Sequence, residues 1–117
     1  MIVFLTKDLM IQSNASATAR QAGVLIKAIG NLENAIATAA EAPSNLLLVD
    51  LQMPGLDIGV LIERLSAFDK PPRAIAFAQH VEEELIAMAR AGGFESVLTR
   101  GQFSRDLPAI VKEHAEK

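Results

Sequence analysis

Short hydrophobic runs alternate with longer segments of mixed polarity along the whole chain. The runs at 2–5, 46–49 and 74–77 are hydrophobic at nearly every position, which is typical of strands buried on both faces of a parallel sheet. Two shorter runs, at 24–26 and 97–98, complete a set of five predicted strands. The pattern therefore predicts strands that lie between layers of helices.

The segments between these runs are long enough for helices, and several carry helix-capping residues at their ends. Gly23 is a plausible C-cap, while Asn31 and Ser104 are suitable N-caps. We expect helices at 9–22, 32–41, 59–68, 81–91 and from 104 to the C-terminus. Pro108 then falls in or near the first turn of the last helix, where proline is tolerated.

Five strands alternating with five helices predict an α/β fold of the (βα)5 type. Such a chain forms a parallel sheet with helices on both faces and right-handed crossovers. We expect the flavodoxin-like strand order 2-1-3-4-5. The chain has 117 residues and no visible linker or repeat, so we expect residues 1–117 to form a single domain.

Composition narrows the possible functions. The net charge of −3 argues against nucleic-acid binding, which needs clustered Lys and Arg. The absence of Cys excludes disulfides, thiol catalysis and thiolate metal sites. No run approaches the roughly 20 apolar residues of a membrane span, and the apolar start is too short for a signal peptide. We therefore expect a cytoplasmic protein with no membrane partner.

Candidate chemistry gathers where two predicted strands end. In open parallel sheets, ligands bind outside the carboxyl ends of the strands, where the strand order reverses. For the expected order this point lies between the first and third strands. Lys7 and Asp8 follow the first strand, and Asp50 ends the third. Two carboxylates and an ammonium group should therefore meet in one crevice.

The segment from Leu46 to Asp57, LLLVDLQMPGLD, resembles the phosphoacceptor segment of response-regulator receiver domains. In that family an apolar strand delivers an aspartate that is followed, after two residues, by Met-Pro. Here Ile58 separates Asp57 from Gly59, which is a small departure. The segments 87–98 and 103–107 are also similar to the family. The resemblance implies that Asp50 occupies the position that accepts a phosphoryl group from a histidine kinase.

The same resemblance implies further site residues, and this sequence departs from most of them. Lys7 stands at the first of two acidic positions that help to hold Mg²⁺, so that only Asp8 remains. Ala78 replaces a Thr or Ser, and Arg100 replaces a Lys that binds the phosphoryl group. Val97 stands where many members carry a Tyr or Phe that reorients on activation. These departures indicate a degenerate, pseudo-receiver site.

The lysine at position 7 changes the expected electrostatics most. We expect its ammonium group to form an ion pair with Asp8 and Asp50 and to neutralise them in place of Mg²⁺. It would also repel a metal ion by about 1 to 4 kcal/mol per unit charge at about 4 Å. Asp8, Asp50 and the Gln52 backbone carbonyl would remain as a weak or absent Mg²⁺ site, so we expect no resident cofactor.

Two alternatives stay open for these residues. Asp8 is equally suited to be the N-cap of the first helix. A shift of one residue in the first strand would turn Lys7 away from the crevice.

Three functions are consistent with the sequence. The first is a stand-alone pseudo-receiver of two-component phosphorelay signalling that is not an enzyme. It would bind a histidine kinase or another signalling protein through helix 81–91, strand 97–98 and the last helix, with Ile86 at this surface. The second is a working receiver that is phosphorylated on Asp50 with Mg²⁺. The third is a flavodoxin-like domain that binds a small anion near Lys7 and Arg100.

Overall fold

The structure is a computed structural model, and it describes residues 1–116. Its strands are β1 (Ile2–Leu5), β2 (Ile26–Ile29), β3 (Leu46–Asp50), β4 (Arg73–Ala78) and β5 (Ser96–Thr99). Its helices are α1 (Leu9–Gln21), α2 (Leu32–Ala39), α3 (Ile58–Ser66), α4 (Glu83–Ala91) and α5 (Arg100–Ala115). The ten elements alternate in the predicted order.

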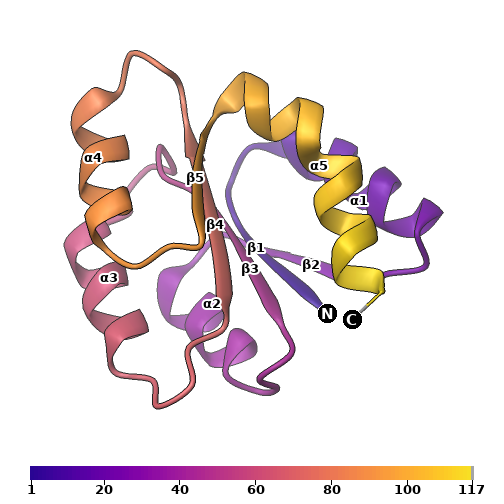
Figure 1. The fold of residues 1–117 in the computed structure, drawn as a ribbon, viewed down its shortest axis with the longest axis horizontal. Helices are drawn as coiled ribbons and strands as arrows, with labels where there is room; N and C mark the ends of the chain where they lie inside the picture. The colour runs from indigo at the N-terminus through magenta and orange to yellow at the C-terminus, as the bar shows by residue number, and fades with distance from the viewer. Residues whose placement is uncertain (117) are drawn as a thin grey trace.

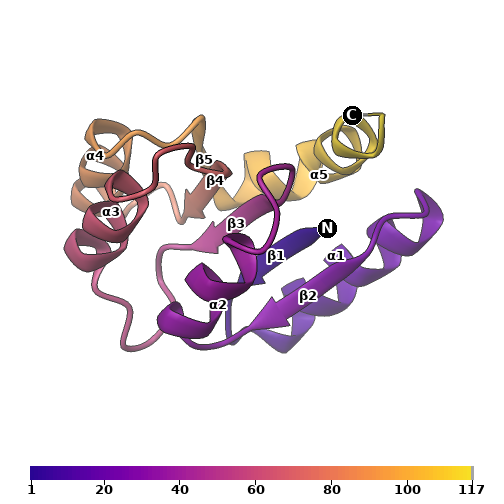
Figure 2. The same ribbon diagram turned by 90° about the horizontal axis from the view of Figure 1, so that it is seen from below.

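The five strands form one parallel sheet in the order β2-β1-β3-β4-β5, which confirms the predicted topology. Helices α1 and α5 cover one face, and α2, α3 and α4 cover the other (Figure 1). Figure 2 shows the same layers from a second direction. The order reverses between β1 and β3, so their carboxyl ends flank the expected crevice.

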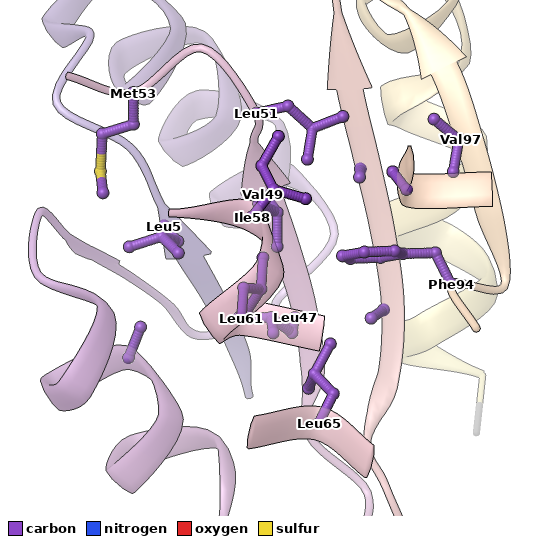
Figure 3. Packing of buried hydrophobic residues seen from close by; sticks show 14 of the residues in the cluster. Leu5, Leu47, Val49, Leu51, Met53, Ile58, Leu61, Leu65, Phe94 and Val97 are labelled. Atoms are coloured by element: carbon purple, nitrogen blue, oxygen red, sulfur yellow. The ribbon is translucent and has the colours of Figure 1, made fainter. Parts of the chain in front are cut away.

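Alternate residues of the central strands fill two separate cores. On β1, Val3 and Leu5 face α2, α3 and α4, whereas Ile2 and Phe4 face α1 and α5. All four are fully buried, as the continuous hydrophobic run predicts. The core on the side of α2, α3 and α4 is shown in Figure 3.

Three phenylalanines hold α5 against the sheet near the carboxyl ends of the strands. The rings of Phe77 on β4 and Phe103 on α5 stack at 4.1 Å between centroids and 18° between planes. Phe4 on β1 contacts both, at 6.1 Å and 5.9 Å. Such pairs add about 0.5 to 1.5 kcal/mol beyond burial of their area. The start of α5 is therefore fixed rigidly beside the crevice.

Helix α5 begins earlier than the sequence analysis expected, at Arg100 and not near Ser104. Its N-cap is Thr99, whose side chain accepts from the Gln102 N–H while the Gln102 side chain accepts from the Thr99 N–H. This reciprocal capping box gives a stronger start signal than a lone serine. As a result Pro108 lies inside the helix and not in its first turn.

Strand β2 is also displaced from its predicted position at 24–26. The Val24 N–H still bonds to the Ala19 carbonyl, so the turn that ends α1 extends to this residue. Parallel pairing of β1 with β2 starts at Ile2 and Ile26. The hydrophobic run therefore marks the approach to the strand as well as its first residue.

We predict that Pro108→Ala raises the free energy of unfolding by about 1 to 3 kcal/mol, because proline inside a helix lacks an N–H and crowds the preceding turn. Urea unfolding followed by circular dichroism measures this change. Lys112→Ala, on the same helix and also exposed, is the control and should change stability by less than about 0.5 kcal/mol. Loss of stability in Pro108→Ala would contradict the prediction.

Candidate functional site

The loops after β1, β3, β4 and β5 enclose a cleft of about 310 Å³ at the carboxyl edge of the sheet. Its lining residues lie at or just after the carboxyl ends of these four strands: Lys7, Asp8, Asp50, Gln52, Pro54, Gln79 and Arg100. The structure therefore brings together the charged residues that the sequence analysis placed there. Ala78 ends β4 and is fully buried, and it does not line the cleft.

Asp50 is the last residue of β3 and is 5% exposed. One carboxylate oxygen, Oδ2, accepts a hydrogen bond from the Thr6 hydroxyl at 2.9 Å. The other, Oδ1, accepts from the Gln52 N–H at 3.0 Å. A buried carboxylate is tolerated when each oxygen is hydrogen-bonded in this way. Both partners of Asp50 are neutral groups supplied by the chain itself.

Thr6 is the site residue that the sequence analysis missed. Leu5 pairs with Val49 in the sheet, so the next residue of each strand, Thr6 and Asp50, lie side by side. The Thr6 oxygen also accepts from the Asp8 N–H at 3.1 Å. The signal in the sequence is its position as the first polar residue after the β1 run, and charge alone does not reveal it.

Asp8 is the N-cap of α1, which confirms one of the two alternatives left open for it. Its Oδ1 accepts from the N–H groups of Met10 at 3.0 Å and Ile11 at 3.3 Å. Its Oδ2 forms an ion pair with the Arg100 guanidinium. The Ile11 N–H above all, and then Arg100, hold the pKa of Asp8 below its usual value. Both oxygens of this carboxylate are thus engaged.

The prediction that Lys7 forms an ion pair with Asp8 and Asp50 is wrong. The exposed Lys7 ammonium donates to the Pro54 carbonyl at 3.2 Å, and no ion pair joins it to Asp8 or Asp50. The reason is that Thr6 takes the place beside Asp50, so the Lys7 side chain leaves by a different path. That path passes over Gly30, where a Cβ atom would lie 3.1 Å from the Lys7 Cγ.

Arg100 supplies the cation that pairs with Asp8. It is the first residue of α5, and its guanidinium carbon lies 5.9 Å from the centre of the Phe77 ring. Contact with an aromatic face and an ion pair with Asp8 hold the same group from two sides. The Arg100 side chain is one-third exposed, so it borders the cleft and is not buried beneath it.

Two positions that matter in the family carry no polar side chain here. Ala78 pairs with Thr99 in the sheet, and its methyl group belongs to the core under α2, α3 and α4. Val97 is 8% exposed in the same core. Neither residue has a side-chain atom that can donate a hydrogen bond into the cleft.

A glutamine bridge closes the remaining side of the cleft. The Gln52 side-chain oxygen accepts from the Gln79 N–H at 2.7 Å, which joins the loop after β3 to the loop after β4. The Lys7–Pro54 bond joins the loops after β1 and β3, and the Arg100–Asp8 pair joins those after β5 and β1. These three bonds, the inter-loop ties, link all four loops around Asp50.

The residues of the cleft fit a magnesium ion poorly. Mg²⁺ prefers an octahedron of oxygen ligands that includes one or two carboxylates. All four oxygens of Asp8 and Asp50 already accept hydrogen bonds within the chain, and two cationic side chains border the cleft. Among residues 1–116 no three His, Cys, Asp or Glu side chains are placed to hold a metal ion together.

Comparison with known proteins gives structural likeness without sequence likeness. No family model and no curated protein matches the chain. The chemotaxis response regulator CheY4 of Vibrio cholerae has a TM-score of 0.77 and 15% identity, with 97% of this chain and 96% of that chain covered. This chain has the fold of a response-regulator receiver domain.

A second receiver-fold neighbour is informative because it holds a metal. The receiver domain of the sensor histidine kinase PA1611 of Pseudomonas aeruginosa carries a magnesium ion coordinated in its active-site cleft. It has a TM-score of 0.78 and 16% identity, with 99% of this chain and 97% of that chain covered.

FixJ-N gives a TM-score of 0.78 at 17% identity, over 97% of this chain and 90% of that one. At such identities the shared property is the receiver fold.

No helix among residues 1–116 of this receiver fold is long and apolar enough to cross a membrane, which agrees with the sequence analysis on this point.

We predict that Asp8→Asn lowers stability at neutral pH and that this difference disappears in strongly acidic solution. The pKa of Asp8 is lower in the folded than in the unfolded chain. Its ionised form therefore stabilises the fold at pH values above the ordinary aspartate pKa of about 3.9. This stabilisation is lost as the pH falls through that value towards the pKa of the folded state. Urea unfolding of both proteins between neutral and acidic pH measures the convergence.

Asparagine keeps the N-cap acceptor and loses the charge, so this comparison isolates the ionised carboxylate. A stability difference that is constant with pH would show that the charge of Asp8 is irrelevant.

Proposed function

We propose that this protein is a receiver-type signalling domain that acts by binding a protein partner and does not use Asp50 as an efficient phosphoacceptor. The observation that carries this proposal is the state of the Asp50 carboxylate. Both of its oxygens accept hydrogen bonds from within the chain, from Thr6 and from Gln52. It forms no ion pair within the described chain, 1–116.

Phosphoryl transfer to a carboxylate needs positive charge and donors at the transferred group, because an anion attacks an anion. In this cleft the Arg100 guanidinium is bound by Asp8. The Lys7 ammonium is bound by the Pro54 carbonyl. Ala78 contributes only a methyl group. The groups that would stabilise the reacting phosphoryl are thus absent or engaged, so we expect no enzymatic self-phosphorylation.

A receiver fold that lacks phosphoryl chemistry still has an outer surface that can bind a partner protein. Between α4 and the end of β5 this surface has a groove of about 650 Å³, lined by His80, Glu83, Ile86, Ala87, Arg90, Ala91 and Thr99. Mixed charges beside apolar side chains suit a protein interface. We place the partner on α4, β5 and α5, and we expect it to be a histidine kinase or another cytoplasmic protein of a two-component pathway.

Ile86 has a different place on this surface from the one expected. Its side chain is 9% exposed and packs into the core with Ala89 and Val97, so it forms the floor of the groove and not an exposed contact. The exposed large hydrophobic residue of α4 is Met88, at 47%. Helix α4 starts at Glu83, later than predicted, and its buried residues are Ile86 and Ala89.

The receiver-fold neighbours support a signalling function. CheY4 is named as a chemotaxis response regulator, and the domain from PA1611 belongs to a sensor histidine kinase. The alternative that Asp50 is phosphorylated with Mg²⁺ would require Arg100 to leave Asp8 and serve as the cation. The alternative of small-anion binding would require Lys7 and Arg100 to leave the partners they have within the chain.

We predict that incubation of the pure protein with acetyl phosphate and Mg²⁺ leaves its intact mass unchanged. The physical reason is that Asp8 engages the Arg100 guanidinium and that Ala78 has no hydroxyl to hold the transferred group. Intact mass spectrometry measures the fraction that gains a phosphoryl group.

Asp50→Asn is the matched control, because it keeps the shape of the side chain and removes the nucleophile. Any adduct should be equal in the two proteins. Stoichiometric addition to the wild type that Asp50→Asn abolishes would establish the working receiver in place of our proposal.

A further inference from the structure

We infer that the chain's own groups have replaced a divalent cation in the cleft, and that Thr6 and Lys7 account for the replacement. This inference deepens the proposed function, because it names what keeps the cleft in one state. It concerns metal binding alone, and it can therefore fail while the proposed absence of phosphorylation stands.

The first observation is the spacing of oxygens beside Asp50. The Thr6 hydroxyl oxygen and the Asp50 Oδ2 are 2.9 Å apart. Adjacent ligands of an octahedral Mg²⁺, each at about 2.0 to 2.1 Å from the metal, are also about 2.9 Å apart. Two oxygens are thus at ligand spacing, but a hydroxyl proton lies between them. Position 6 has the geometry of a metal ligand without the charge.

The second observation is the balance of charge in the cleft. Its charged lining residues are Lys7, Asp8, Asp50 and Arg100, which sum to two positive minus two negative charges, or zero. A divalent cation gains little from a neutral site and must be stripped of tightly held water to enter it. Of the two cations, Arg100 is engaged by Asp8, whereas Lys7 faces only a carbonyl. Lys7 is therefore the cation of the cleft that has no carboxylate partner.

The third observation is that the loops are already fixed. A metal ion in a cleft of this kind would join the loops that carry its ligands. Here the inter-loop ties do this: Lys7 with Pro54, Gln52 with Gln79, and Arg100 with Asp8. A metal ion would have to displace part of this arrangement. It would not order the loops further, because the ties already join them. The cleft is therefore expected to keep one state whether or not Mg²⁺ is present.

Two double variants test the inference. Thr6→Asp with Lys7→Ala adds a carboxylate beside Asp50 and removes the unpaired cation. Thr6→Asn with Lys7→Ala has the same shape without the carboxylate. Mg²⁺ is titrated into each protein and into the wild type with no phosphoryl donor, and amide shifts of Asp8, Asp50 and Gln52 are followed by NMR together with the melting temperature.

We expect saturable shifts and a rise in melting temperature for the aspartate variant at millimolar Mg²⁺. Its apparent affinity should exceed that of the asparagine variant and of the wild type at least about tenfold. Saturable binding of Mg²⁺ by the wild type at the same residues would overturn the inference. So would a folded aspartate variant that binds no tighter than the asparagine variant.

The aspartate variant places two carboxylates side by side, and this could prevent folding without metal. Folding that is restored by Mg²⁺ would then support the inference, since it reports binding to the native state. If Mg²⁺ does not restore folding, the single variants Lys7→Asp and Lys7→Asn decide the question. A gain in Mg²⁺ affinity of the aspartate over the asparagine variant supports the inference, and equal affinities overturn it.

Discussion

A buried carboxylate governs the arrangement of this cleft. Asp50 ends the central strand, where its side chain is nearly inaccessible to water, and a carboxylate there must find donors within the chain. Thr6 and the Gln52 N–H provide them. Thr6 in turn accepts from the Asp8 N–H, which helps to set the start of α1. The placement of neighbouring groups follows from the need to satisfy one acid.

The nearest ion pair to Asp50 in the cleft joins two other residues and does not include Asp50. Asp8 binds Arg100, and Arg100 also contacts the ring of Phe77, which stacks on Phe103 of the same helix. This chain of contacts connects the N-termini of α1 and α5 to the aromatic core. A ligand that binds Arg100 or Asp8 must therefore interact with that residue more strongly than the two residues interact with each other. That requirement is one reason why we propose a fixed binding surface and not a phosphorylation switch.

The fold could be predicted because it depends on the apolar pattern of β1, β3 and β4, which is read directly from consecutive residues. Asp50 and Asp8 were placed in the cleft for the same reason, since Asp50 directly follows one such run and Asp8 lies three residues after another. The partner of Lys7 could not be predicted, because it depends on a path over Gly30 and on which strand residue lies beside Asp50. Both depend on Thr6, an uncharged polar residue, and the pattern of charges along the sequence does not reveal its role.

The two cores explain how a receiver fold can survive changes in its cleft. Val3 and Leu5 face one core while Ile2 and Phe4 face the other, and neither core includes the polar lining of the cleft. Residues of the cleft can therefore differ without a change in packing, and this chain has the same fold as a magnesium-bound receiver at only 16% identity. Since packing and chemistry are specified by different residues, the fold limits where a ligand can bind, and the residues of the cleft decide whether one does.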